Sequence, residues 1–472
     1  MRADCTSEQI EFQGLGRRKV VAGFDAGRAT SDGGVMLLRE VAERSGLLRD
    51  FAACFRDHRD PTRIEHTVEN LVAQRVLGQA LGYEDLNDHD WLRDDALLAV
   101  AVGKSDPIGA QRKRERDRGH ALAAHATLNR LELTPAEADS SSRYQKIVYD
   151  EEAIENLFVE AFLRAHRRPP ERIILDLDAS DDPIHGEQEG RFFHGFYGSY
   201  CYLPLYIFCG DFLLLAKLRR SNIDASAGSR PELERIVGRI REEWPCVEIW
   251  IRADSGFARE EIMRWCEENR VQYVLGLARN SRLQAELAGH MAEAKQRHEE
   301  SGRPERLFKD FGYRTRKTWS RRRRVVGKAE WLPGKENPRF VVTSLAVDTI
   351  GATELYEKIY CARGDMENRI KEQQLGLFAD RTSSHTMRAN QLRLFFASMA
   401  YVLVNELRRA GLAGTALAKA QVGTIRARLL KIGAVVRISI RRIYLALSSV
   451  FPLQDLFRQA LVNLRAAYPL QI

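Results

Sequence analysis

Three acidic residues, far apart in the chain, have the types and settings to do chemistry together. Asp178 and Asp254 each follow an apolar run and precede small residues, and Glu367 comes much later in a stretch with helical spacing. If the two runs are neighbouring strands, their ends can bring all three carboxylates together. Such oxygen donors suit Mg²⁺ or Mn²⁺, and two ions could activate water on one side of a phosphodiester and stabilise the leaving oxygen on the other.

The negative charges of such a cluster should also affect its protonation. Without a cation, three carboxylates would repel one another, and at least one would take up a proton. The ordinary alternative for each aspartate is that it caps a turn at the end of its strand.

A mixed sheet wrapped by helices is predicted to position the acids. Ile173–Asp178 and Val247–Ala253 are strand-like runs that lead to Asp178 and Asp254. The other predicted elements of this part are a hairpin over Leu203–Cys209 and Phe212–Leu218, an aromatic-rich strand over Phe192–Tyr202, helices over Pro231–Trp244 and Arg259–Asn269, and a strand over Gln272–Leu277.

Glu367 lies on a predicted helix over Thr353–Leu377 together with Tyr360 and Arg363. Arg363 and Glu367 are four residues apart and therefore share one face of the helix. Taken alone, this pair could be an ordinary surface ion pair. Its position after a basic segment and two strand-end aspartates favours a role in the site.

Three motifs together resemble the DDE transposases of bacterial insertion sequences, and more closely the insertion-sequence 1380 group. They are Asp178-Ala179-Ser180, Arg252-Ala253-Asp254-Ser255-Gly256-Phe257 and the segment from Tyr360 to Arg369. Similarity extends to residues 82–95 and 429–442, so that the resemblance covers most of the chain.

The resemblance implies an α/β fold, namely a ribonuclease-H-like mixed-sheet core with a β-rich insertion before the last catalytic helix. It implies that Asp178 bridges two Mg²⁺ or Mn²⁺ ions, and that Asp254 and Glu367 each complete one. Asp176 lies on the same side of the strand as Asp178 and stays an alternative, although Asp178 fits the pattern of Asp, small residue, then Ser or Thr better.

The resemblance also implies DNA contacts beside the acids. Tyr360 and Arg363 would contact phosphates near the cut end. Related transposases usually carry a lysine seven residues after the glutamate, whereas this chain has Gln374 there. Lys371, one turn away, could substitute for that lysine.

Residues 303–335 are strongly basic and include the run Arg321, Arg322, Arg323 and Arg324 with Trp319 and Trp331 nearby. The arginines could neutralise DNA phosphates, and one of the tryptophans could stack on a base flipped out near the cleaved end. A solvated arginine patch is the alternative. A second charged run, residues 111–118, is more typical of a solvated helix face.

The expected organisation has five parts. They are a mainly helical DNA-binding or dimerisation region over 1–168, the first part of the catalytic core over 169–280, the basic insertion over 281–350, the rest of the core with the glutamate helix over 351–411, and a basic helical region over 412–472.

Composition agrees with a globular, DNA-binding protein. The chain has 472 residues, 44% apolar residues and a formal charge of +8, which favours an anionic partner. Its seven cysteines, Cys5 among them, have no C-x2-C spacing, so free thiols are expected. No apolar run approaches a membrane span, and no signal peptide is evident, so a cytoplasmic bacterial location is expected.

The expected function is therefore a transposase that binds terminal inverted repeats, frees a 3′-hydroxyl and joins it to target DNA. A homodimer on paired ends would hold both termini. Two alternatives stay open, namely a nuclease of the same fold that does not join DNA, and a non-catalytic DNA-binding protein derived from a transposase.

Overall fold

The computed structural model describes residues 9–469, so Cys5 lies outside the described part of the chain. The chain divides into two compact units. One consists of residues 1–149 together with 399–472, and the other of residues 150–398. Helix α13, Met387–Glu406, begins in the second unit and ends in the first.

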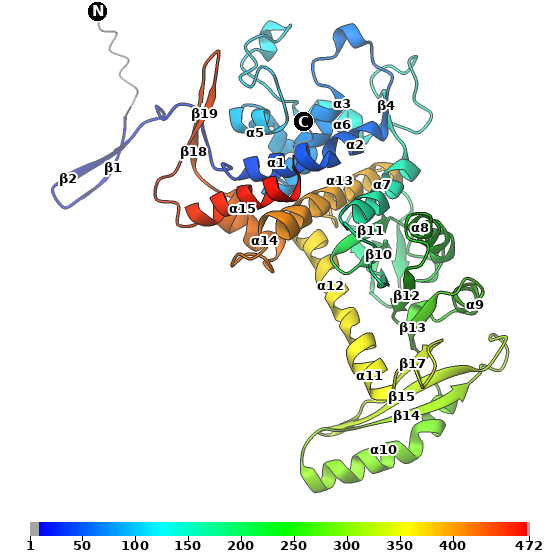
Figure 1. Ribbon diagram of the computed structural model, residues 1–472. Coiled ribbons are helices and arrows are strands. Elements are labelled where there is room, and N and C mark those ends of the chain that lie inside the picture. Colours follow the sequence, from blue (N-terminus) through cyan, green and yellow to red (C-terminus); the bar gives the residue numbers. More distant parts are fainter. Residues whose placement is uncertain (1–8, 470–472) are drawn as a thin grey trace, which may run out of the picture. The chain divides into compact units, whose positions relative to one another are not determined.

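A single large sheet organises residues 150–398 (Figure 1). Its strand order is β11-β10-β6-β12-β13-β17-β15-β14, with β16 paired to β15. Strand β6 is parallel to β12 and β12 to β13, while the remaining pairs are antiparallel. The strands are β6 Arg172–Ala179, β10 Leu205–Cys209, β11 Phe212–Lys217, β12 Glu248–Ala253, β13 Gln272–Leu277, β14 Glu305–Tyr313, β15 Arg323–Leu332, β16 Lys335–Glu336 and β17 Arg339–Thr343.

Alternating side chains give this sheet two apolar faces. On one face, residues such as Ile251 and Leu275 pack with helices, and on the other Trp250 and Val274 pack against Leu355 and Tyr356. The helices of this unit, apart from the glutamate helix, are α7 Glu151–Arg164, α8 Ser229–Glu243, α9 Glu260–Glu268 and α10 Ser281–Ser301. Helix α10 runs alongside β14 and β15 (Figure 1).

The strands predicted to form an insertion extend the central sheet instead of standing apart from it. Strand β17 pairs with β13 on one side and with β15 on the other. Residues 150–168 likewise belong to this unit. The reason is that Phe162 on α7 packs edge-on against Phe212 and Trp244 in the core of the sheet.

A small second sheet in the same unit carries aromatic residues. It consists of β7 Asp182–Pro183, β9 Ser199–Tyr202 and β8 Phe192–His194, in the order β7-β9-β8. The sequence predicted one strand over residues 192–202, whereas the chain turns back at Gly198 to form a hairpin.

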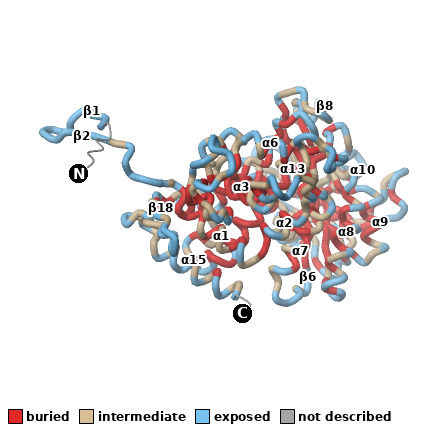
Figure 2. Tube along the Cα trace, turned by 90° about the horizontal axis from the view of Figure 1, so that it is seen from above, coloured by how far each residue is buried: buried red, intermediate tan, exposed pale blue. Residues whose placement is uncertain are grey.

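The other unit is mainly helical and joins early and late parts of the sequence. Its helices are α1 Val35–Ser45, α2 Leu47–Ala53, α3 Val68–Leu81, α4 His89–Leu92, α5 Ala96–Ala101, α6 His125–Glu132, α14 Val422–Ile425 and α15 Gln454–Ala467. Its strands are β1 Ile10–Leu15, β2 Arg18–Ala22, β3 Ala29–Thr30, β4 Phe55–Asp57, β5 Ile147–Tyr149, β18 Ala434–Ile438 and β19 Ile443–Leu447. Strands β1 and β2 are exposed along their whole length (Figure 2).

Gly33 and Gly34 allow the early part of the chain to pack closely against residues 429–432 of its late part. The Gly33 amide donates to the Ile432 carbonyl over 2.8 Å, and a Cβ on Gly34 would lie 2.1 Å from the Leu429 oxygen. Only a residue without a side chain allows so close an approach.

Among residues 9–469, no helix combines the length and apolar character that a membrane span requires.

Candidate active site

Asp178 lies near the end of β6, in register with Tyr206 of β10. Burial, together with the nearby charges of Asp254 and Glu367, raises the pKa of this carboxyl to about 6, and the charge of Arg363 opposes the increase. The two other acids therefore lie close enough to repel Asp178. The expectation that clustered carboxylates would favour a proton on one of them agrees with this shift.

Asp254 follows directly after β12. Because Ala253 is paired in parallel register with Leu177, Asp254 and Asp178 emerge at the same edge of the sheet. Asp254 also accepts a hydrogen bond from the Gly256 amide over 2.8 Å and thereby caps the short helix η4, Ser255–Phe257. The turn-capping interpretation and the site interpretation are thus both compatible with this residue.

Glu367 lies on a helical run over residues 352–376 whose hydrogen-bonding pattern changes along its length (Figure 1). The run consists of α11 Ala352–Glu354, the π-helix η5 Leu355–Tyr360, the 3₁₀-helix η6 Cys361–Arg363, α12 Gly364–Lys371 and the π-helix η7 Glu372–Gly376. π-Helical turns inside helices often mark functional sites. Here they flank the segment that carries Arg363 and Glu367.

Arg363 is the cation of the cluster. One guanidinium nitrogen lies 2.6 Å from the Glu367 carboxylate and another lies 3.8 Å from that of Asp178. The Arg363 side chain is 19% exposed, so solvent screens this interaction only in part. Arg363 therefore links Glu367 to Asp178, which an isolated surface ion pair would not do, while the role of the pair in a catalytic site stays a prediction.

Tyr360 lies beside the strand end that carries Asp254, and burial raises its pKa, with Asp254 contributing to the increase. Gly276 of β13 makes room for this ring. A Cβ on Gly276 would lie 2.5 Å from the Tyr360 hydroxyl and 2.9 Å from the Ser255 nitrogen. A larger residue at position 276 would push the tyrosine away from the acids.

Asp176, the alternative first acid, is engaged elsewhere. Its two carboxylate oxygens accept hydrogen bonds from Arg252 over 2.5 and 2.8 Å, and Arg252 also donates to the Ile359 carbonyl. Asp176 is 3% exposed and Arg252 is 8% exposed. This bidentate pair ties β6 and β12 to the helical run and leaves Asp178 as the aspartate of β6 that faces the other acids.

The role of Arg252 was not predicted from the sequence, although a signal for it is present there. Arg252 lies two residues before Asp254, as Asp176 lies two residues before Asp178. In parallel strands with both acids at one edge, these two residues must be neighbours on the same side. Tyr197 was also missed. Its hydroxyl lies 3.4 Å from the Ala179 carbonyl, and burial and the charges of Asp181, Asp178 and Asp254 raise its pKa to about 12.

The donor chemistry of the three acids fits a hard divalent cation, but the side chains are arranged around Arg363 instead. Within residues 9–469, no group of three His, Cys, Asp or Glu side chains stands ready to hold a metal ion. The guanidinium neutralises two of the carboxylates in this arrangement. Binding of a cation would require small side-chain movements that release Arg363.

Gln374, which stands where related transposases carry lysine, donates from its side chain to the Asp181 carbonyl over 3.1 Å. Lys371 is exposed. The structure therefore gives Gln374 a local structural contact and leaves the ammonium of Lys371 accessible to solvent.

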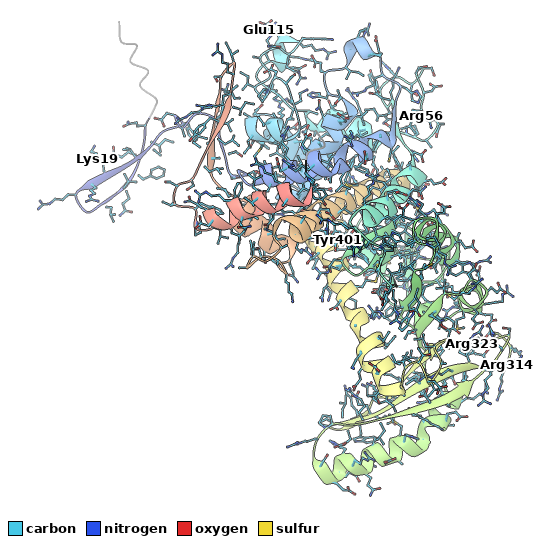
Figure 3. All side chains as sticks on the ribbon, in the orientation of Figure 1. Lys19, Arg56, Glu115, Arg314, Arg323 and Tyr401 are labelled. Carbon is cyan, nitrogen blue, oxygen red and sulfur yellow. The ribbon has the colours of Figure 1, made fainter. Side chains whose placement is uncertain are left out.

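Most of the predicted DNA-binding arginines are already ion-paired. Arg323, labelled in Figure 3, is buried. It contacts Glu260 and Glu267 over 2.6 and 2.7 Å. Arg321 also pairs with Glu267, and Arg324 pairs with Asp310 over 2.6 Å. Arg322 is exposed, and the described structure shows no ion pair for it.

The predicted stacking role does not suit Trp319. Its ring is 4% exposed and packs edge-on against Tyr313 in the apolar core, which leaves no free face for a base. The physical reason is that Trp319 fills the space beneath the arginine run. Trp331 lies near Lys295, whose ammonium is 5.4 Å from the ring centre.

A family model described as the transposase DDE domain group 1 matches residues 12–469. The chain belongs to this family. Membership confirms the predicted kinship with DDE transposases and implies a metal-dependent polynucleotidyl transferase, while the narrower insertion-sequence 1380 assignment stays a prediction.

Two further comparisons complete the picture of this DDE family member. No curated protein matches the chain. Among solved structures, it is similar to the piggyBac transposase in a synaptic complex with hairpin DNA, with 12% identity and a TM-score of 0.40 over 94% of this chain and 87% of that one.

Proposed function

We propose that this protein is a DNA transposase that binds the terminal inverted repeats of an insertion sequence, cleaves at their ends and joins the 3′-hydroxyls to target DNA. The observation that carries the proposal is the meeting of Asp178, Asp254 and Glu367 at one sheet edge in a chain of the DDE family. The strand order β11-β10-β6-β12-β13, an antiparallel meander followed by parallel strands, supports a ribonuclease-H-like core.

In this proposal the three acids are the ligands of two Mg²⁺ or Mn²⁺ ions. When bound, such ions supply Lewis-acid stabilisation to the attacking and leaving oxygens of a phosphodiester. The carboxylate oxygens are the right donors for them. Asp178, which holds a proton below about pH 6, must lose it before it can serve as a ligand.

Arg363 would act as a placeholder. Before metal binds, its guanidinium limits the repulsion between Asp178 and Glu367. Once released, it would lie beside the acids with its donors free for a DNA phosphate, as would the Tyr360 hydroxyl. Arginine suits this exchange because its planar donors match carboxylate and phosphate equally well.

A transposase, a nuclease and a non-catalytic DNA-binding protein differ in the DNA products that they form. The test supplies the full-length protein with Mg²⁺, a labelled duplex carrying the element's end and a target plasmid, and a second reaction starts from ends that are already cut. We expect cleavage in the first reaction and joined product in both, each abolished by Asp254→Asn.

Each other outcome points to a different function. Cleavage without joining from pre-cut ends would show a nuclease, and DNA binding without either reaction would show a non-catalytic DNA-binding protein. A homodimer on paired ends is part of the proposal. Light scattering of the protein bound to one and to two ends would test it.

A further inference from the structure

The hairpin formed by β8 and β9 exposes an unusual number of aromatic rings beside the candidate active site. Phe196 is 86% exposed, Phe193 58% and Tyr200 47%. Exposed aromatic rings gathered on one small element are costly in water and mark an interaction surface. The mechanism proposed above makes no use of them.

This aromatic hairpin, residues 191–202, is held firmly at its base. The Tyr202 ring is fully buried and its hydroxyl donates to the Glu189 carbonyl over 2.5 Å, while Ser221 donates to the Phe192 carbonyl over 2.9 Å. The Glu189 amide in turn donates to the His385 carbonyl over 2.9 Å. A rigid base means that the rings at the tip are preorganised for binding.

Tyr197 joins the tip of the hairpin to the strand that carries Asp178. Tyr197 lies between His194 and Phe196, with ring centres 4.9 and 5.0 Å away. Its hydroxyl lies 3.4 Å from the carbonyl of Ala179, the neighbour of Asp178. Tyr197 is half-buried, whereas Phe196, the preceding residue in the turn, is exposed to solvent.

Cationic side chains border the rings. Arg220 is exposed next to Gly190. The Arg191 guanidinium lies 4.9 Å from the centre of the Tyr200 ring and also pairs with the exposed Glu187 over 2.5 Å, so Arg220 is the cation better able to meet a phosphate. Aromatic rings interleaved with arginine are the combination that binds single-stranded nucleic acid, because bases stack on the rings while cations meet the backbone.

We propose that the aromatic hairpin is a stacking platform for an unpaired nucleobase of the DNA strand next to the scissile phosphate, with Phe196 as its main contact. This inference rests on the proposed function, since that function brings DNA to the acids. The role that the sequence suggested for Trp319 or Trp331 would thus fall to Phe196, on an element before the catalytic helix. By holding a base out of the duplex, Phe196 would position the phosphate over Asp178 and Asp254.

The first test is photochemical crosslinking, which needs no turnover. End duplexes carry 5-iodouracil at successive positions around the cut site, are bound in Ca²⁺, irradiated and analysed by peptide mass spectrometry. We expect a crosslink to the peptide containing residues 192–202 from a base close to the cut, and its loss in Phe196→Ala. Phe24→Ala is the matched control, because Phe24 is 96% exposed in the other unit.

The second test is kinetic. We expect Phe196→Ala to slow end cleavage about 10- to 100-fold, Phe196→Trp to restore it, and a substrate left unpaired at the crosslinked base to recover most of the loss. Because Phe196 is exposed, the melting temperature should not change, which separates this effect from misfolding.

The outcomes separate this inference from the proposed function. If the wild-type protein crosslinks through the hairpin but neither cuts nor joins, the platform stands and the proposed activity fails. If the wild-type protein cuts normally, no crosslink reaches the hairpin and Phe196→Ala cuts at the normal rate, the platform is overturned. Loss of dimers in Phe193→Ala and Phe196→Ala with crosslinks unchanged would also overturn it, because the rings would then be a protein interface.

Discussion

The candidate active site and the arginine run of residues 321–324 both concentrate charge of one sign, but they differ in how that charge is balanced. Around Arg323, the carboxylates of Glu260 and Glu267 supply nearly ideal partners. Around Asp178, two further acids share one arginine. The charge of Arg323 is fully balanced by its two partners, whereas the surroundings of Asp178 have an excess of negative charge.

This difference teaches that the density of charge in a sequence is a poor guide to binding. A buried, fully paired charge cannot take a new partner without losing the old one. A cluster with uncompensated charge has a standing reason to bind a counterion or a proton. Four experiments test whether the two regions differ in this way.

The largest effect is expected at the acids. Glu367→Gln removes a proposed ligand without changing the shape of the side chain, and we expect end cleavage to fall at least about 10³-fold. The measurement is the initial rate of strand cleavage in Mg²⁺. Asp365→Asn, which removes an exposed acid from the same helix, is the control and should cleave at nearly the wild-type rate. Equal losses in both variants would contradict a specific role for Glu367.

At the fully paired Arg323, we expect a substitution to lower the stability of the protein and not its activity. Arg323→Ala would leave Glu260 and Glu267 without their shared partner, and we expect the free energy of unfolding to fall by about 3 kcal/mol. Urea denaturation followed by circular dichroism measures it. Arg322→Ala, at the exposed neighbour, should stay within about 0.5 kcal/mol of wild type. A stable Arg323→Ala variant with weakened DNA binding would reverse our interpretation of this run.

The third experiment uses the pKa of Asp178, which is raised from 3.8 to about 6 in the folded protein. The folded state therefore binds this proton more tightly than the unfolded state does, and the wild type loses stability as the pH rises from about 4 through 6. Asp178→Asn cannot ionise and escapes this loss. In a chelator, the variant should become more stable than wild type by about 2–3 kcal/mol above pH 6.

The control for this pH dependence is the metal itself. Added Mg²⁺ should stabilise the wild type above pH 6 and have little effect on Asp178→Asn. A stability difference that stays constant from pH 4 to pH 8 would show that Asp178 does not carry the shifted pKa.

The smallest effect concerns Arg322. Because it is exposed and has no ion pair in the described structure, it is the member of the run best able to neutralise a phosphate. Arg322→Ala should lower the slope of log binding constant against log salt by about 0.9, the value for one phosphate contact. Fluorescence anisotropy with labelled end DNA measures the slope. If the slope is unchanged for Arg322→Ala but reduced for Arg321→Ala, then Arg321 and not Arg322 contacts the phosphate.

Local patterns predicted much of the fold. The strands that end at Asp178 and Asp254 form where their apolar runs predict them, because alternating and branched apolar residues favour a half-buried strand. The helix expected over Thr353–Leu377 is present as a helical run over residues 352–376. Its changes of hydrogen-bonding pattern were not predicted, because the sequence of this segment shows only a continuous helical spacing.

The same limit explains what was missed. Trp319 and Arg323 look like surface residues in a basic stretch. In the structure, Trp319 packs in the apolar core, and Arg323 pairs with two glutamates that lie more than fifty residues earlier in the chain. The hairpin at residues 191–202 was expected as one strand, since nothing local shows that it folds back beside the acids.

The order and types of the residues predicted the kind of chemistry, because they show three acids in family-like settings and the strands and helix that carry them. The folded arrangement was needed to show which charges are compensated, because pairing depends on distances across the sheet that no local pattern encodes. It therefore assigned Asp176 and Arg323 to structural ion pairs, left Asp178 in an acid cluster, and placed the exposed Phe196 beside Tyr197, whose hydroxyl approaches the neighbour of Asp178.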